Sequence, residues 1–156
     1  MSNKSIDIRP AEHRDLPAIL ALQKLAYRSE AELLNDYAIQ PLRQTIDQLE
    51  TEYHKGEMLK AVDPHTDDTI VGSIRGYVDA GTLHLGKLMV HPEFQRRGIG
   101  SRLILALERS HPDVRYELFT TTRSVGNLAL YHRLGYRDFK YERRNDVDMV
   151  ILQKNA

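Results

Sequence analysis

The chain of 156 residues contains no cysteine and no excess of charge of either sign. Without cysteine it has no disulfide framework, no thiolate nucleophile and no cysteine-ligated metal site, and we expect no metal. Its 22 lysine and arginine residues balance its 22 aspartate and glutamate residues. Because this balance creates no basic field over the whole chain, we expect no nucleic-acid partner.

Long hydrophobic runs are missing as well. No segment approaches the roughly 20 apolar residues that span a bilayer, and residues 1–10 lack the apolar run of a signal peptide. We therefore expect a cytoplasmic protein with no membrane partner. The length suits one hydrophobic core, and no internal repeat or low-complexity linker marks a boundary. Residues 1–156 are accordingly expected to form a single domain.

The hydrophobic residues that are present change their period between residues 83 and 107, from strand-like to helix-like. Pro92 ends the strand, because proline has no N–H to donate to a neighbouring strand. The strand residues are Leu83, Leu85, Leu88 and Val90, and the residues of the helical face are Ile99, Leu103, Ala106 and Leu107. This order predicts a strand, a short loop and a helix.

The loop carries two arginines, Arg96 and Arg97, and two glycines, Gly98 and Gly100. Glycine is tolerated where the backbone must approach another group closely or adopt a positive φ. The first N–H groups of a helix are unpaired donors with a partial positive charge, so the loop offers a site for a diphosphate. The alternative is a tight turn with solvated arginines. The order fits Q/R-x-x-G-x-G/A, and neither a Walker A loop nor a dinucleotide fingerprint.

Residues 85–103 resemble the acetyl-CoA-binding motif of the GCN5-related N-acetyltransferase (GNAT) superfamily. The resemblance implies an enzyme that transfers an acetyl group from acetyl-CoA to a primary amine by direct attack in a ternary complex. It also implies that backbone N–H groups of residues 96–101 hold the pyrophosphate and that the pantetheine arm pairs with the central strand. The implied cofactor-binding residues are Leu88, Met89, Val90, Gln95, Arg96, Arg97, Gly98, Ile99, Gly100, Ser101, Asn127 and Tyr131.

A second pair of residues, Asn127 and Tyr131, is spaced to lie on one face of a helix. In the family, an asparagine at this place binds the pantetheine arm and a tyrosine lies next to the coenzyme sulfur. A neutral phenol can protonate the departing thiolate, so Tyr131 is the expected catalytic acid. Taken alone, Tyr131 is also compatible with an ordinary half-buried aromatic.

The sequence offers several candidates for the group that accepts the proton of the amine, because Gly86 stands where many family members carry a glutamate. His84, two residues earlier on the same strand face, is one substitute, since its reference pKa lies near neutral pH. Acidic side chains in residues 28–40 are others, namely Glu30, Glu32 and Asp36. Deprotonation through a chain of water molecules is equally open.

The acceptor is expected to be a small-molecule amine bound by Tyr27, Glu30 and Tyr37. The acids of this segment could attract a cationic amine, with the two tyrosines as aromatic walls. For the oxyanion of the tetrahedral intermediate, the resemblance points to backbone donors near Met89 and Val90. A catalytically weak module that senses coenzyme A remains the alternative function, and a homodimer through the last hairpin is left open.

Elsewhere the chain alternates short strands and helices. Asp15 is expected to cap a helix that runs to about Tyr27, and Pro41 to begin a helix that Gly56 ends, while residues 28–40 are not assigned. The remaining expected strands are residues 6–9, 58–62, 70–78, 116–121, 139–144 and 147–152, with a helix at 127–134. With the resemblance, these segments predict an α/β fold of the α+β type. The resemblance implies the GNAT fold, a mixed, mostly antiparallel sheet of six to seven strands with about four helices on both faces.

Overall fold

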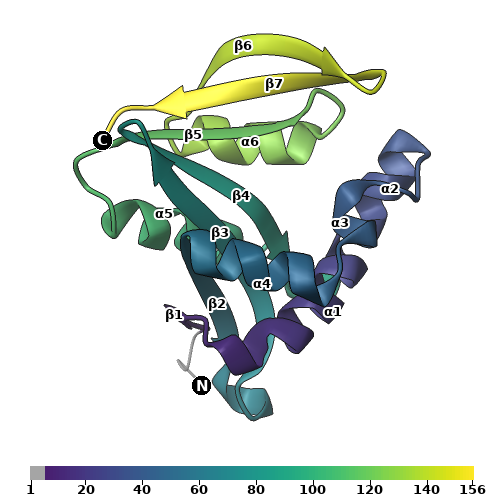
Figure 1. The fold of residues 1–156 in the computed structure, drawn as a ribbon, viewed down its shortest axis with the longest axis vertical. Helices are drawn as coiled ribbons and strands as arrows, with labels where there is room; N and C mark the ends of the chain where they lie inside the picture. Colours follow the sequence, from purple (N-terminus) through teal and green to yellow (C-terminus); the bar gives the residue numbers. More distant parts are fainter. Residues whose placement is uncertain (1–5) are drawn as a thin grey trace.

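The computed structural model describes residues 6–156 and has one mixed sheet of seven strands flanked by helices (Figure 1). The strands are β1 (Asp7–Pro10), β2 (Glu57–Asp63), β3 (Thr69–Asp79), β4 (Thr82–Val90), β5 (Arg115–Thr121), β6 (Arg137–Arg144) and β7 (Val147–Lys154). The helices are α1 (Leu16–Ala26), α2 (Arg28–Leu34), α3 (Gln40–Arg43), α4 (Ile46–Lys55), α5 (Ile99–Arg109) and α6 (Val125–Arg133). The predicted α+β class and strand number are confirmed, with more helices than expected.

The strands follow the spatial order β1-β2-β3-β4-β5-β7-β6, and only β4 and β5 run parallel. That parallel pair is short, because it joins Thr82–His84 to Arg115–Glu117 and then stops. Beyond it, β5 pairs on its other side with β7 over residues 116–121. Figure 1 shows β5 running across the end of β4 instead of alongside it. The sheet therefore has a fork at its centre.

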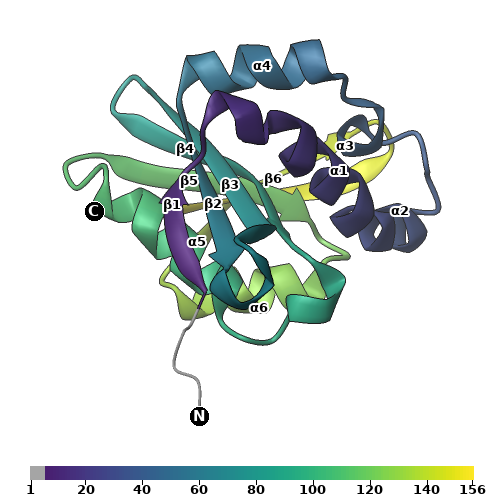
Figure 2. The ribbon, with the colours of Figure 1, turned by 90° about the horizontal axis from the view of Figure 1, so that it is seen from below.

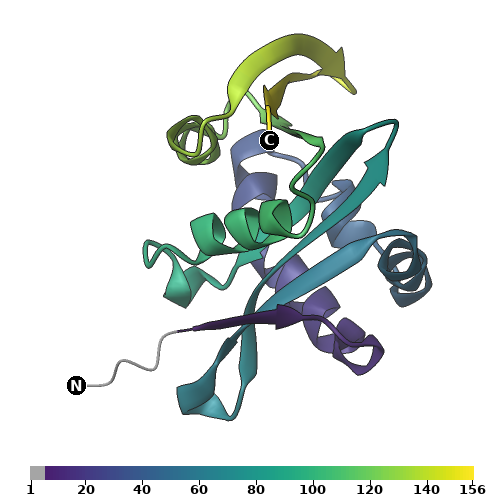
Figure 3. The ribbon, with the colours of Figure 1, turned by 90° about the vertical axis from the view of Figure 1, so that its left-hand side faces the viewer.

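Helices cover both faces of the first half of the sheet, with α5 on one face and α1 and α4 on the other (Figure 2, Figure 3). The buried apolar side chains form one core on each of these two faces. The core under α5 includes the fully buried Leu83, Leu103 and Leu107, and the core under α1 and α4 includes Ile19 and Leu49. Two apolar cores thus hold the strands that carry the fork.

Two expectations about the first helices need correction. Asp15 occupies the N-cap position of α1, but its side chain does not cap the helix, because its carboxylate accepts hydrogen bonds from the Glu12 N–H and from Lys60 Nζ, both at 2.7 Å. The single helix expected after Pro41 is split into α3 and α4. Thr45 begins α4 with a reciprocal capping box, in which Thr45 and Gln48 each accept a hydrogen bond from the other's backbone N–H. The unassigned segment 28–40 contributes α2 and the first residue of α3.

The last two strands form the predicted hairpin around Asn145 and Asp146. Both turn residues have positive φ, 49° and 64°, as a two-residue turn between twisted strands requires. This places β6 at one edge of the sheet, where most of its side chains are exposed. Dimerisation through this hairpin stays a prediction. Within residues 6–156, no helix combines the length and apolar character needed to cross a membrane.

Candidate active site

A cavity of about 930 Å³ lies along the fork between β4 and β5. Its size falls within the range of small-molecule and cofactor sites. Most sequence-predicted site residues line it, from the central strand, the glycine loop and two flanking helices. The predicted residues among its walls are Tyr27, Glu30, His84, Leu88, Met89, Val90, Gln95, Arg96, Gly98, Ile99, Gly100, Ser101, Asn127 and Tyr131.

The glycine loop turns through two left-handed residues, Arg96 with φ 64° and Gly98 with φ 77°. Gly98 is the N-cap of α5, and its carbonyl accepts the first helical hydrogen bond from the Arg102 N–H at 3.1 Å. The backbone N–H groups of residues 99–101 therefore have no carbonyl one turn earlier to pair with. Consecutive N–H groups in such a turn form a concave nest for an anion, at the positive end of the helix dipole.

The two glycines of the loop meet different requirements. A Cβ atom at Gly98 would contact nothing within 4 Å, but the positive φ of this residue disfavours any side chain. Gly100 has ordinary helical backbone, and a Cβ there would lie 3.5 Å from Leu130 and 3.7 Å from Leu88. Gly98 is thus needed for backbone conformation, whereas Gly100 leaves space beside apolar cavity walls and could be replaced by alanine. This difference accounts for the G-x-G/A form of the motif.

The two arginines of the loop also differ. Arg96 lines the cavity. Arg97 folds back onto the preceding turn, where its guanidinium lies 4.7 Å from the centre of the Phe94 ring and donates to the Glu93 carbonyl at 3.3 Å. Arg97 is not among the residues that line the cavity. Of the two predicted cationic side chains, the structure brings only Arg96 to the site.

A β-bulge in β4 decides which of the two cores each later side chain of the central strand joins. Opposite β3, the register shifts between Ser73 and Arg75, and Lys87 has φ 53°. Leu83 and Leu85 belong to the core under α5, so plain alternation would place Met89 there as well. Instead Met89 lies in the core under α1 and α4, and Leu88 and Val90 pack toward α5.

Tyr131 sits deep in the cavity wall, with 6% of its surface exposed. Its ring lies 6.3 Å from the ring of Tyr136. Burial and then the charge of Glu30 raise the pKa of the Tyr131 hydroxyl above its ordinary value. The phenol is therefore protonated at neutral pH. Asn127, one turn earlier on α6, lines the same cavity, as the four-residue spacing predicted.

Tyr27 and Glu30 form the wall on the α1–α2 side. The Tyr27 hydroxyl donates to the Leu88 carbonyl at 3.4 Å, so it ties the end of α1 to the central strand. Burial raises the pKa of both the Tyr27 hydroxyl and the Glu30 carboxyl. The charge of Glu30 also raises the pKa of Tyr27 and of Tyr131. The Glu30 carboxylate thus lies near enough to both cavity tyrosines to affect their ionisation.

His84 lies at the closed end of the fork, on the last residue pair that joins β4 to β5. Its ring stacks on Tyr77 at 5.0 Å between centroids, and its Nδ1 lies 3.5 Å from a carboxylate oxygen of Glu117. Gly86, two residues on, faces the cavity with open space where a Cβ would be. This position of β4 therefore supplies no carboxylate to the cavity.

Several charged residues of the cavity wall were missed from sequence, and three of them, Glu52, Arg75 and Lys87, form one group. Arg75 Nη1 lies 2.9 Å from Glu52 Oε1, and Lys87 Nζ lies 3.9 Å from Glu52 Oε2. Burial lowers the pKa of both cations. Arg75 is the one charged residue between Ile70 and Val78, and such a charge within an apolar strand was the available signal.

Other predicted acceptor residues lie outside the cavity. Tyr37 is 62% exposed, and neither it nor Glu32 or Asp36 is among the lining residues. The Asp36 carboxylate accepts a hydrogen bond from the Ala38 N–H at 2.9 Å, which stabilises the turn after α2. Of the three acids proposed in residues 28–40, only Glu30 lines the cavity.

Comparisons with known proteins agree with this geometry. The family model described as Acetyltransferase (GNAT) domain matches residues 61–138, which is half of the chain. An uncharacterized N-acetyltransferase of Methanocaldococcus jannaschii is 32% identical over 97 residues, covering 56% of this chain and 62% of that relative's length.

Solved structures share the fold at low sequence identity. PaiA N-acetyltransferase from Thermoplasma acidophilum, solved in complex with coenzyme A, has TM-score 0.76 and 21% identity, with 97% of this chain and 99% of that chain covered. YncA, a putative acetyltransferase from Salmonella typhimurium solved with acetyl-CoA, has TM-score 0.75 and 18% identity, with 97% and 94% covered. A GNAT-family acetyltransferase from Streptococcus agalactiae has TM-score 0.80 and 14% identity, with 97% and 95% covered. The forked sheet, the glycine loop and the family match together lead to one conclusion: this chain belongs to the GNAT family of acetyltransferases.

Proposed function

We propose that residues 1–156 act as one acetyl-CoA-dependent N-acetyltransferase domain, which transfers the acetyl group to a primary amine of a small molecule. The observation that carries the proposal is the cavity along the fork, which meets the unpaired N–H groups at the start of α5. Two GNAT structures with the same fold contain coenzyme A or acetyl-CoA, which supports this cosubstrate.

The cofactor would lie along the fork. Its diphosphate would accept hydrogen bonds from the N–H groups of residues 96–101, beside Gln95 and Arg96, and near the Ser101 side chain. Its pantetheine arm would pair with the free edge of Leu88–Val90, as an added strand does, and contact Asn127 on the other side. Because Arg97 is engaged with Phe94 and Glu93, we assign the cationic contact to Arg96.

The chemical step joins the amine nitrogen to the thioester carbonyl carbon and breaks the carbon–sulfur bond. The nitrogen releases a proton and the sulfur gains one, so no oxidant or metal is needed for the balance. Backbone N–H groups near Met89 and Val90 would stabilise the oxyanion. Tyr131, which burial keeps protonated, would donate a hydrogen bond and then its proton to the leaving sulfur.

Glu30 is our candidate for the group that accepts the amine proton. Its raised pKa makes it a better base than an ordinary surface glutamate, and it lies close enough to Tyr131 to affect that phenol's pKa. His84 is less suited, since its ring is stacked on Tyr77 and faces Glu117 at the closed end of the fork.

The part of the cavity wall around Glu30 and Glu52, which we call the acceptor end, has no excess of acidic side chains. The acids Glu30 and Glu52 are matched by the cations Arg75 and Lys87, and Glu52 pairs with both cations. The attraction for cationic amines that the acids of residues 28–40 suggested thus loses most of its support. We propose a primary amine whose recognition depends on shape and hydrogen bonds more than on a second positive charge.

Release of free thiol from acetyl-CoA tests the proposed reaction. We expect release to depend on an added primary amine, across a panel of polyamines, amino sugars, amino acids and peptide N-termini, with an acetylated product of the matching mass. Reactions without amine serve as controls for hydrolysis. If every amine leaves the rate at that background while coenzyme A still binds, the chain is a coenzyme A-binding module and the proposed transfer is wrong.

Substitution of Gly98 tests the diphosphate site. Gly98→Asp places a negative charge where we propose the phosphates bind, so the Kd for coenzyme A should rise by at least about tenfold in calorimetry. Gly81→Asp is the matched control, because Gly81 has nearly the same φ, 78°, and equally open surroundings. It should carry the same backbone strain and leave the Kd unchanged. Equal affinities for Gly98→Asp and the parent chain would refute this placement.

Substitution of Tyr131 tests the proton donor. Tyr131→Phe should lower turnover by roughly 10²- to 10⁴-fold, the usual contribution of a positioned general acid, with little change in the Kd for acetyl-CoA. Tyr136→Phe is the control, because Tyr136 is a buried neighbour whose hydroxyl donates to Glu108 at 2.8 Å. It should lower stability and leave turnover intact. Full turnover in Tyr131→Phe would mean that the sulfur receives its proton from another group.

Glu30→Gln tests the proton acceptor and the buried charge together. The folded-state pKa of Glu30 is raised, so the stability it contributes is present below the unfolded pKa and is lost as pH rises through the folded one. The amide cannot ionise. We therefore expect Glu30→Gln to unfold at higher urea concentration than the parent at pH 7, with the gain disappearing below about pH 4, and to turn over more slowly.

The matched control is Glu32→Gln, an exposed glutamate on the same helix, whose effect on stability should stay within about 0.5 kcal/mol. A parent-like urea midpoint for Glu30→Gln at pH 7 would show that this carboxylate is well solvated. A stability gain with unchanged turnover would leave Glu30 as a wall of the cavity and not the base.

A further inference from the structure

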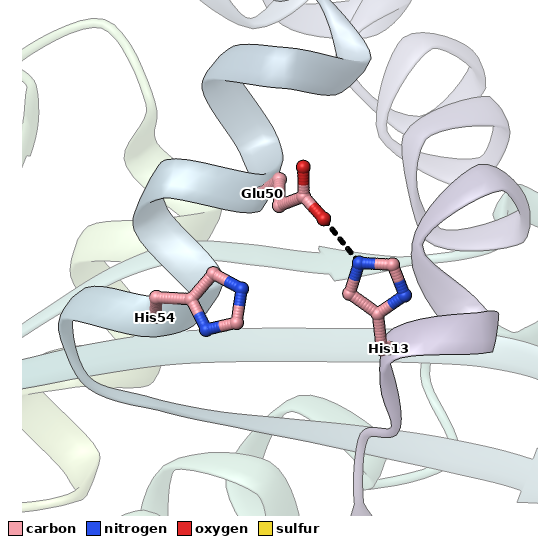
Figure 4. Close-up of side chains that lie close together, drawn as sticks. All are labelled: His13, Glu50 and His54. Carbon is pink, nitrogen blue, oxygen red and sulfur yellow. Dashed lines mark hydrogen bonds and ion pairs between the residues drawn. The ribbon is translucent and has the colours of Figure 1, made fainter.

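Two histidines and a glutamate gather on the outer side of α4, away from the cavity (Figure 4). Glu50 and His54 are four residues apart on α4 and therefore lie on one face of the helix. His13 comes from the 3₁₀ turn His13–Asp15 that leads into α1. Glu52, which lines the cavity, is about 200° around the helix axis from Glu50. The cluster and the acetyl-transfer site thus occupy opposite faces of α4.

The three side chains are already arranged around a common space. His13 Nε2 contacts the Glu50 carboxylate, and the rings of His13 and His54 have their centroids 6.2 Å apart. Tyr53 packs edge-on against both rings, at 6.0 Å and 5.2 Å. Figure 4 shows the two imidazoles on either side of the carboxylate. One potential ligand atom from each residue lies within 4.8 Å of the others.

We propose that His13, Glu50 and His54 bind a divalent transition-metal ion of the zinc type. Two imidazole nitrogens and one carboxylate oxygen are ligands that such ions prefer, and three protein ligands leave a fourth position for water. Metal–ligand bonds of about 2.0–2.2 Å place tetrahedral ligand atoms about 3.3 Å apart. The ion would therefore replace the direct contact of His13 with Glu50 and draw the more distant ligand atoms together by at most about 1.5 Å, which small side-chain rotations can supply.

A metal-free ion pair accounts for only part of this arrangement. The pair of His13 and Glu50 needs no third member, yet His54 presents its ring to the same space without a hydrogen-bonding partner among residues 6–156. A bound ion would use all three and would join the segment before α1 to α4. Helices α1 and α4 cover the sheet face behind the acceptor end of the cavity. The ion would therefore stabilise this layer of helices.

Calorimetric titration of the untagged full chain with zinc chloride tests the site. We expect one ion per chain, and affinity more than about tenfold weaker in His13→Gln and in His54→Gln. Magnesium and calcium chloride should not compete, because these cations prefer all-oxygen sites. The matched control is His132→Gln. His132 Nε2 pairs with Asp138 at 2.8 Å in the same way, but no third ligand is grouped with them.

Cobalt provides a readout that does not depend on the variants. The parent chain should bind Co²⁺ with the intense visible absorption of a tetrahedral site, and zinc should abolish that absorption. Zinc should also raise the melting temperature of the parent and of His132→Gln, but not of His13→Gln. Absence of saturable zinc binding, or equal binding by the parent and both cluster variants, would overturn the proposal whether or not the chain transfers acetyl groups.

Discussion

The separation of β4 from β5 is the constraint on which the rest of the structure depends. Backbone N–H and C=O groups inside a sheet are normally paired, and leaving them without partners costs free energy. Here β4 and β5 pair only through Thr82–His84 and Arg115–Glu117, at one end of the strands. The remaining edge of β4 faces the cavity, where a ligand or water must satisfy it. Pairing with β7 and not with β4 holds β5 in place beyond this point.

Left-handed backbone conformations at two non-glycine residues also occur around the cavity. Eight non-glycine residues among residues 6–156 have positive φ, and six of them are Asn, Asp or Ala in turns or at a helix end. The other two are Lys87 and Arg96, and both line the cavity. Left-handed backbone at such residues costs of order 1 kcal/mol or more and persists only where the surroundings hold it. The bulge and the glycine loop are thus two places where the fold accepts strain to shape one site.

A buried polar network supports the acceptor side. Arg75 donates to Glu52, to Gln44 and to the side-chain oxygen of Gln23, so β3 is joined to α1, α4 and the segment between α3 and α4. Removing one partner from such a network typically costs about 3–5 kcal/mol, because a buried charge is left uncompensated. The same helix α4 carries Glu50 and His54, two members of the cluster with His13, on its outer face. Its two faces therefore have separate chemistry, and the helix is fixed by the network on the inner one.

Much of the site could be predicted from the sequence because its signals are short in range. The change of period around residue 90, the left-handed requirement at Gly98 and the helical spacing of Asn127 and Tyr131 each depend on a few neighbouring residues. The alternative of a simple turn at Gly98 could not be dismissed locally, since a turn and an anion nest share the same backbone. The family match and the fork favour the anion nest.

Tertiary structure decided the remainder, for physical reasons that no local pattern contains. The bulge at Lys87 reverses the alternation of β4, so Met89 faces one core and Leu88 the other. Packing of α1–α4 brings Glu52, Arg75 and Lys87 to the cavity and leaves Tyr37 in solvent. The sequence by itself determined the class of fold and predicted the glycine loop as the cofactor site, because periodicity and backbone preference are properties of neighbouring residues. Which distant side chains share the acceptor end depended on how the helices pack on a forked sheet, because those contacts join residues far apart in the chain.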